Sequence, residues 1–198
     1  NVAFLTPRLR REFGGCAANI AYTLRALGGE PVILATVGQD GREYLDRLTG
    51  FGIDTGHIRL LADHYTAQAF ITTDLDDNQI TAFHPGAMNQ SHLNQITPAL
   101  GAGLAIVAPD GRDGMLQHAE QLAQHKIPFM FDPGQGLHGP PIRQVGVLAG
   151  QRQTVTAQIA CPPFEQRNPQ GQAQGVDQTG KITTKELVLQ GLGRGGQQ

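Results

Sequence analysis

The sequence predicts an α/β protein whose parallel sheet is flanked by helices. Short apolar runs rich in β-branched residues, at 31–37, 103–108 and 127–131, alternate with amphipathic segments of helical spacing. Strand, helix and strand follow one another with short connections between 103 and 131, which is typical of a right-handed crossover unit in a parallel sheet. With 198 residues, 39% of them hydrophobic, the chain is long enough to bury one sizeable core.

A glycine turn at Gly14 and Gly15 precedes the first predicted helix. The two glycines let the backbone turn tightly and approach a ligand, because no Cβ interferes. Apolar residues then recur at helical spacing until Gly28 and Gly29, where we expect the helix to end in a left-handed cap. Asn19 falls in the first turn of this helix. Its amide can contact a bound ligand or satisfy nearby backbone, and the sequence leaves both open.

The middle of the chain predicts a helix, a short strand and a hairpin. Residues 41–51 place apolar side chains on one side of a helix, and a short strand follows near 57–61. Residues 65–84 alternate on either side of an Asp-rich turn and therefore predict a hairpin. Because both faces of its strands carry polar groups, we expect this hairpin to lie over a wet pocket and not in the core.

Aspartates stand directly after two of the apolar runs. Asp110 follows 103–108, and Asp132 follows 127–131. Open α/β sheets bind ligands beyond the carboxyl ends of their strands, so both are candidates for a ligand contact. The alternative for each is a capping or turn aspartate. Asp113 is expected to be the N-cap of the helix that follows it.

The character of the sequence changes at His138. Residues 138–198 are rich in Gln and Gly, show no sustained period and contain two Pro-Pro pairs. Such a segment buries little apolar area, so we expect an irregular tail that packs poorly. We therefore divide the chain into an α/β domain at 1–137, with the lid hairpin at about 65–84, and a tail at 138–198.

Composition disfavours several classes of protein. The formal charge of −2 provides no basic patch of the kind that nucleic-acid binding requires. No run of eighteen apolar residues and no signal-peptide pattern is present, so we expect a cytoplasmic protein that does not act at a membrane. The histidines and the two cysteines, Cys16 and Cys161, lack the spacing of a metal site, and we expect no metal centre and two free thiols.

The run from Gly14 to Asp40, GGCAANIAYTLRALGGEPVILATVGQD, resembles the first signature region of the ribokinase-like (PfkB) family of carbohydrate and nucleoside kinases. Residues 66–73, 78–89 and 131–134 fit the same family and look closest to its bacterial adenosine-kinase-like members. The resemblance covers about residues 1–137. It implies a ribokinase-like parallel sheet with a small β-sheet lid. In that family an aspartate-bearing strand opens the fold, so we expect the chain to begin inside the family pattern.

The resemblance also implies a function. It implies ATP-dependent phosphoryl transfer to a sugar or nucleoside hydroxyl, with adenosine or another ribose-bearing acceptor as substrate and with ATP and Mg²⁺ as cofactors. Gly14, Gly15 and Asn19 would contact the hydroxyls of the acceptor. Phe70 or Phe83 would offer apolar surface to a base or sugar face, and a homodimer would form through the lid.

One part of the family pattern is not found. The second signature, an Asp-Thr-x-Gly-Ala-Gly-Asp type run whose last aspartate is the base, has no match, nor has the Asn-x-x-Glu motif associated with magnesium. We therefore assign no catalytic residue, no ATP-binding residue and no metal ligand. The alternative is a catalytically incomplete relative that at most binds the sugar or nucleoside, and we expect turnover far below that of an intact relative.

Overall fold

The structure is a computed structural model that describes residue 6, residues 8–134, and two C-terminal segments at 185–189 and 193–197. Its elements, in chain order, are β1 (Arg10–Phe13), α1 (Cys16–Ala26), β2 (Glu30–Gly38), α2 (Arg42–Gly50), β3 (Ile58–Leu61), β4 (Ala67–Thr73), β5 (Gln79–His84), the 3-10 helices η1 (Gly86–Leu93) and η2 (Pro98–Leu100), β6 (Leu104–Val107), α3 (Arg112–Gln124), β7 (Phe129–Phe131), β8 (Lys185–Leu189) and β9 (Gly193–Gln197).

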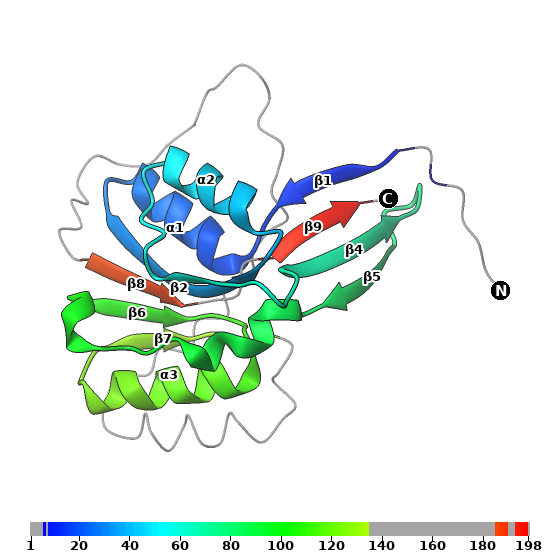
Figure 1. The fold of residues 1–198 in the computed structure, drawn as a ribbon. Coiled ribbons are helices and arrows are strands. Elements are labelled where there is room, and N and C mark those ends of the chain that lie inside the picture. The colour runs from blue at the N-terminus through cyan, green and yellow to red at the C-terminus, as the bar shows by residue number, and fades with distance from the viewer. Residues whose placement is uncertain (1–5, 7, 135–184, 190–192, 198) are drawn as a thin grey trace.

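The main sheet has five parallel strands in the order β3-β2-β8-β6-β7. Helices α1 and α2 cover one face and α3 covers the other (Figure 1). Successive side chains of a strand point to opposite faces, and β2 shows this directly. Ile33 and Ala35 pack into the core beneath α1 and α2, whereas Val32 and Leu34 join the core beneath α3. Because β2 is buried on both faces, it reads as a continuous apolar run.

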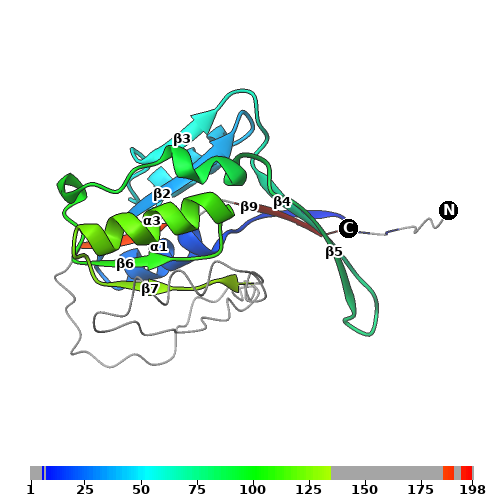
Figure 2. The same cartoon turned by 90° about the horizontal axis from the view of Figure 1, so that it is seen from below.

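A second sheet has the order β1-β9-β4-β5. Strands β4 and β5 form the antiparallel hairpin that the sequence predicts, while β9 runs parallel to β4 and antiparallel to β1. The sheet projects away from the helices in both views (Figures 1 and 2). Every residue of β5 is exposed, so this hairpin contributes little to the core.

The tail requires a correction. Residues 185–189 and 193–197 form strands that the sequence analysis did not predict, and β8 lies in the middle of the main sheet between β2 and β6. A strand of five residues is too short to show a period, and its partners lie about 80 to 155 residues earlier in the chain. The rest of the predicted irregular tail lies outside the described residues.

The N-terminus of α3 also differs from the prediction. Asp113 is not the N-cap, because the helix begins one residue earlier and Gly111 occupies that position without a side-chain cap. Asp113 instead lies in the first turn, where its negative charge interacts favourably with the helix dipole.

Candidate functional site

The candidate site is built around the turn of Gly14 and Gly15, which joins β1 to α1. Gly15 has φ 104° and ψ 134°, a conformation that a residue with a Cβ rarely adopts. Helix α1 begins at the next residue, so its free N–H groups face the turn. The sequence therefore needs glycine at this position to bring a helix N-terminus and exposed backbone together.

Tyr44 of α2 holds the turn in place. Its hydroxyl donates a hydrogen bond of 2.5 Å to the carbonyl oxygen of Gly14, and its ring stacks on Phe13 with centroids 4.9 Å apart. The side chain is buried, and this burial raises the pKa of the Tyr44 hydroxyl far above its usual value, against a smaller opposing effect of Arg47. The hydroxyl therefore stays a protonated donor at any physiological pH.

Asn19 lies one turn into α1, close in sequence to the glycines. Its backbone N–H donates to the carbonyl oxygen of Gly15 at 3.1 Å, and the residue is half-buried. Within the described part of the chain, its side-chain amide makes no hydrogen bond, so it does not serve to satisfy nearby backbone. The amide is thus available to a ligand hydroxyl.

Phe70 and Phe83 lie on the two strands of the hairpin and are exposed at 48% and 53%. The register pairs Phe70 with Ala82 and Ala69 with Phe83. Directly opposed residues of an antiparallel pair share one face, so the two phenylalanines lie on opposite faces of the hairpin. One face of the hairpin can therefore present only one of them to a ligand.

The aspartates after β6 and β7 both organise turns. One carboxylate oxygen of Asp110 accepts the backbone N–H of Gly111 at 2.7 Å. Asp132 accepts the backbone N–H of Gly134 at 2.9 Å. Each of the two residues is therefore a turn aspartate, which was the alternative to a ligand contact that the sequence left open.

Asp40 is a third aspartate of this kind, and the sequence analysis did not single it out. It follows β2, and its carboxylate accepts hydrogen bonds from Thr66 and Gln68, where the lid hairpin begins. The signal that drew attention to Asp110 and Asp132, an aspartate just beyond an apolar strand, is present here as well. All three therefore lie at the carboxyl edge of the main sheet, because its strands are parallel.

No group of three or more His, Cys, Asp or Glu side chains among the described residues could hold a metal ion. His118 is buried, and its ring Nε2 lies 3.1 Å from the backbone carbonyl oxygen of Asn94. His84 ends β5 on an exposed strand. The described helices include none with the length and apolar character needed to cross a bilayer.

The fold and the candidate site together define the class of this protein. It is a parallel α/β domain with a projecting second sheet and with a glycine turn at a helix N-terminus, where such domains bind ligands. The comparison with family models is specific: residues 1–133 match the pfkB family carbohydrate kinases. The chain belongs to this family, and its fold is the ribokinase-like fold that the sequence predicts.

Among curated proteins, the chain is similar to the nucleoside kinase of Methanothermobacter thermautotrophicus, with 36% identity over 145 residues, which are 70% of this chain and 46% of the relative. Among solved structures, it is similar to the nucleoside kinase of Burkholderia thailandensis in complex with inosine, with 55% identity and a TM-score of 0.66 over 75% of this chain and 50% of that one. The nucleoside kinase of Methanocaldococcus jannaschii is 29% identical, with a TM-score of 0.61 over 69% of this chain and 46% of that one. The chain thus spans about half the length of the relatives it matches.

Proposed function

We propose that this protein transfers a phosphoryl group from ATP to a hydroxyl of a nucleoside. The observation that carries the proposal is the glycine turn, which Tyr44 holds in place and which Asn19 follows, with a side-chain amide that makes no hydrogen bond to the described residues. Backbone N–H groups at a helix N-terminus and a side-chain amide are donors and acceptors that suit the hydroxyls of a ribose. The similarity of the chain to nucleoside kinases supports a nucleoside rather than a simple sugar as the acceptor.

Adenosine and inosine are the acceptors that we propose to test. The Burkholderia thailandensis relative was solved with inosine, and the sequence resemblance favours adenosine. The two purine nucleosides carry the same ribose and differ in the base. An apolar side chain of the hairpin, either Phe70 or Phe83, would stack against that base in both cases.

ATP and Mg²⁺ belong to this proposal as the phosphoryl donor and its metal ion. The described residues do not offer a ligand set for Mg²⁺, and we assign neither a metal ligand nor a catalytic base to them. The part of the chemistry that we derive is therefore acceptor binding: the turn orients the ribose, and the hairpin covers the base. We place the reaction in the cytoplasm, as expected for a kinase that uses ATP.

We also propose a homodimer through the lid. In the described part of the chain, β5 pairs only with β4, so its other edge is open, and all residues of β5 are exposed. A strand edge of this kind can pair with a second strand. Light scattering of the purified chain, compared with its 21.2 kDa monomer mass, decides between the two states.

Calorimetry with the purified chain tests the function. We expect adenosine or inosine to bind and Asn19→Ala to weaken binding at least tenfold. Gln124→Ala, which removes an exposed amide from α3 on the other face of the sheet, should bind as the wild type does. Mixing nucleoside with ATP and Mg²⁺ then measures turnover. Binding without turnover would favour the alternative of an incomplete relative, and binding of neither nucleoside would overturn the proposal.

A further inference from the structure

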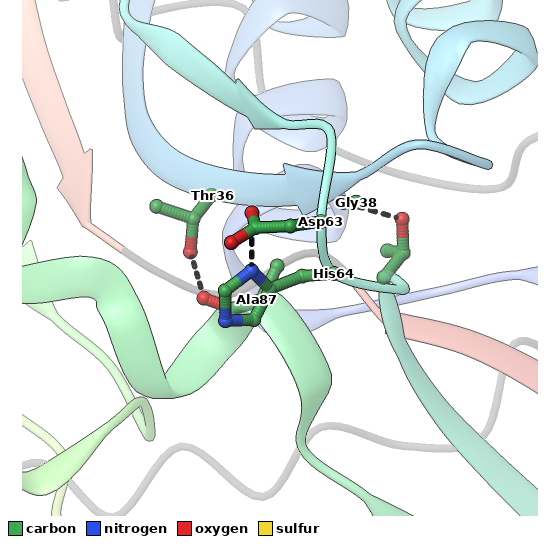
Figure 3. Close-up of polar contacts among 6 residues, drawn as sticks. Thr36, Gly38, Asp63, His64 and Ala87 are labelled. Carbon is green, nitrogen blue, oxygen red and sulfur yellow. Dashed lines mark hydrogen bonds and ion pairs between the residues drawn. The ribbon is translucent and has the colours of Figure 1, made fainter.

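The lid hairpin is tied to the main sheet by side-chain hydrogen bonds at the carboxyl end of β2, and along its length β4 also pairs with β9. The chain enters the hairpin at Thr66 and leaves it at Ala87, and hydrogen bonds tie both points to residues 36–40. Figure 3 shows the contacts of Thr36 with Ala87 and of Gly38 with the entering chain. We call these residues, 36–40 with 64–68 and 87, the lid base.

The entering strand is held by the Asp40 carboxylate. One oxygen accepts two hydrogen bonds from Thr66, from its backbone N–H at 2.8 Å and from its hydroxyl at 2.7 Å. The other oxygen accepts from the amide of Gln68 at 3.2 Å. The Thr66 hydroxyl in turn accepts the backbone N–H of Gly38 at 3.0 Å. A continuous chain of hydrogen bonds thus runs from β2 through Thr66 to Asp40.

The chain that leaves the hairpin after β5 is held by Thr36. Its hydroxyl donates to the carbonyl oxygen of Ala87 at 2.6 Å, and the N–H of Ala87 donates to the carbonyl oxygen of Tyr65 at 2.8 Å. Thr36 and Thr66 are both fully buried. Entry and exit of the hairpin are therefore fixed to β2 and to each other, and the hydroxyls of Thr36 and Thr66 are hydrogen-bonded where water is excluded.

The lid base is closely packed around Gly38. A Cβ on this residue would lie 2.3 Å from the carbonyl oxygen of His64 and 2.4 Å from the N–H nitrogen of Thr66. The exposed fraction of the side chains increases with distance from the base: it is 1% for Ala67, 48% for Phe70 and 70% for Ile80. Because β4 also pairs with β9, the lid base is one of the places that fix the direction of the hairpin. A change at Asp40 would then alter the positions of Phe70 and Phe83.

We propose that Asp40 is a positioning residue of the acceptor site. Its carboxylate sets the angle of the hairpin against β2 and so determines where the apolar face of the hairpin meets a nucleoside on the glycine turn. The two bonds from Thr66 and the one from Gln68 make this carboxylate a strong link, because hydrogen bonds to a charged acceptor are stronger than neutral ones. This inference rests on the proposed function, since it assumes a nucleoside on the turn.

The test compares Asp40→Ala with Asp40→Asn in the full chain. The alanine removes all three bonds. The asparagine keeps an acceptor oxygen for Thr66 but places an amide opposite the Gln68 amide. We expect Asp40→Ala to raise the dissociation constant for adenosine or inosine at least tenfold, equivalent to about 1.4 kcal/mol, and Asp40→Asn to raise it less. Amide hydrogen exchange in β4 and β5 should become faster in the same order.

Two controls separate positioning from simple loss of stability. Asp46→Ala removes an exposed carboxylate from α2, and Ile96→Val mildly destabilises the core beneath α3. In a variant that is only less stable, the apparent dissociation constant rises as the reciprocal of the folded fraction, so it stays close to the wild-type value as long as most molecules are folded. The controls should keep the wild-type affinity and hairpin exchange.

Each outcome decides a different claim. Wild-type affinity together with unchanged hairpin exchange in Asp40→Ala would overturn the role of Asp40. A wild-type chain that binds no nucleoside would overturn the proposed function and the acceptor part of this inference, while hairpin exchange without ligand would still decide whether Asp40 holds the lid. Lower affinity with faster exchange in β4 and β5 would support both.

Discussion

Replacing Tyr44 by phenylalanine tests how the glycine turn is held. The change removes only the hydroxyl that donates to the carbonyl oxygen of Gly14, while the ring keeps its stacking on Phe13. Gly14 is half-buried, so water replaces the lost donor in part. The cost therefore lies near the net value of one hydrogen bond, about 1 kcal/mol, and below the penalty for a fully buried unpaired group.

Urea unfolding measures this cost. With a slope of about 2 kcal/mol per molar urea, the midpoint of Tyr44→Phe should fall by about 0.5 M. The matched control is Tyr22→Phe: the Tyr22 ring packs edge-on against Phe51, and its hydroxyl has no hydrogen bond among the described residues. Its free energy of unfolding should stay within about 0.5 kcal/mol of the wild-type value.

Nucleoside binding provides the second measurement. A turn that has lost its anchor samples more conformations, so the affinity of Tyr44→Phe for adenosine or inosine should decrease, whereas Tyr22→Phe should bind as the wild type does. The effect should not depend on pH between about 6 and 9, because burial keeps the pKa of the Tyr44 hydroxyl well above that range. Equal stability and equal affinity of Tyr44→Phe and wild type would refute the anchoring role of Tyr44.

Two further predictions concern stability. Val188→Pro removes one backbone N–H from β8 in the middle of the main sheet, so the free energy of unfolding should fall by about 3 kcal/mol or more, measured in urea. An unchanged urea midpoint of Val188→Pro would contradict the central position of β8. Burial lowers the pKa of His118 below its ordinary 6.5, so the unfolded chain binds its proton more readily than the folded one does. The His118 contribution should therefore be complete above about pH 6.5 and decrease as the pH falls below it, by at most about 1.4 kcal/mol per pH unit. In His118→Gln, the free energy of unfolding should depend less on pH below about 6.5 than it does in the wild type. An unchanged pH dependence would argue against a neutral buried ring.

Several helices and strands of this fold can be predicted from the sequence, because each has a pattern of apolar residues within its own segment. The helix after the glycine turn repeats apolar residues at helical spacing, and the structure confirms it as α1. Strand β2 is buried on both faces, so a continuous apolar run was enough to predict it. The hairpin of β4 and β5 followed from alternation on either side of a polar turn.

Other features have no local signal. Strand β8 has five residues and pairs with partners far away in the chain, so only the assembled sheet shows where it belongs. Strand β1 is equally short, and its described partner β9 lies at the other end of the chain. Pairing of this kind depends on which strand edges the rest of the fold leaves open. The spacing of residues within the segment therefore does not predict its partner.

For the candidate site, the sequence predicts which residues could contact a ligand, and the packing of the fold shows what holds them. Gly14, Gly15 and Asn19 can be proposed from the sequence because the conformation of a glycine and the position of a residue in a helix depend on neighbouring residues. The bond from Tyr44 to Gly14 spans 30 positions, and the contacts of Asp40 with Thr66 span 26. Such contacts arise only when helices and strands pack, since packing brings distant residues within hydrogen-bond distance of one another.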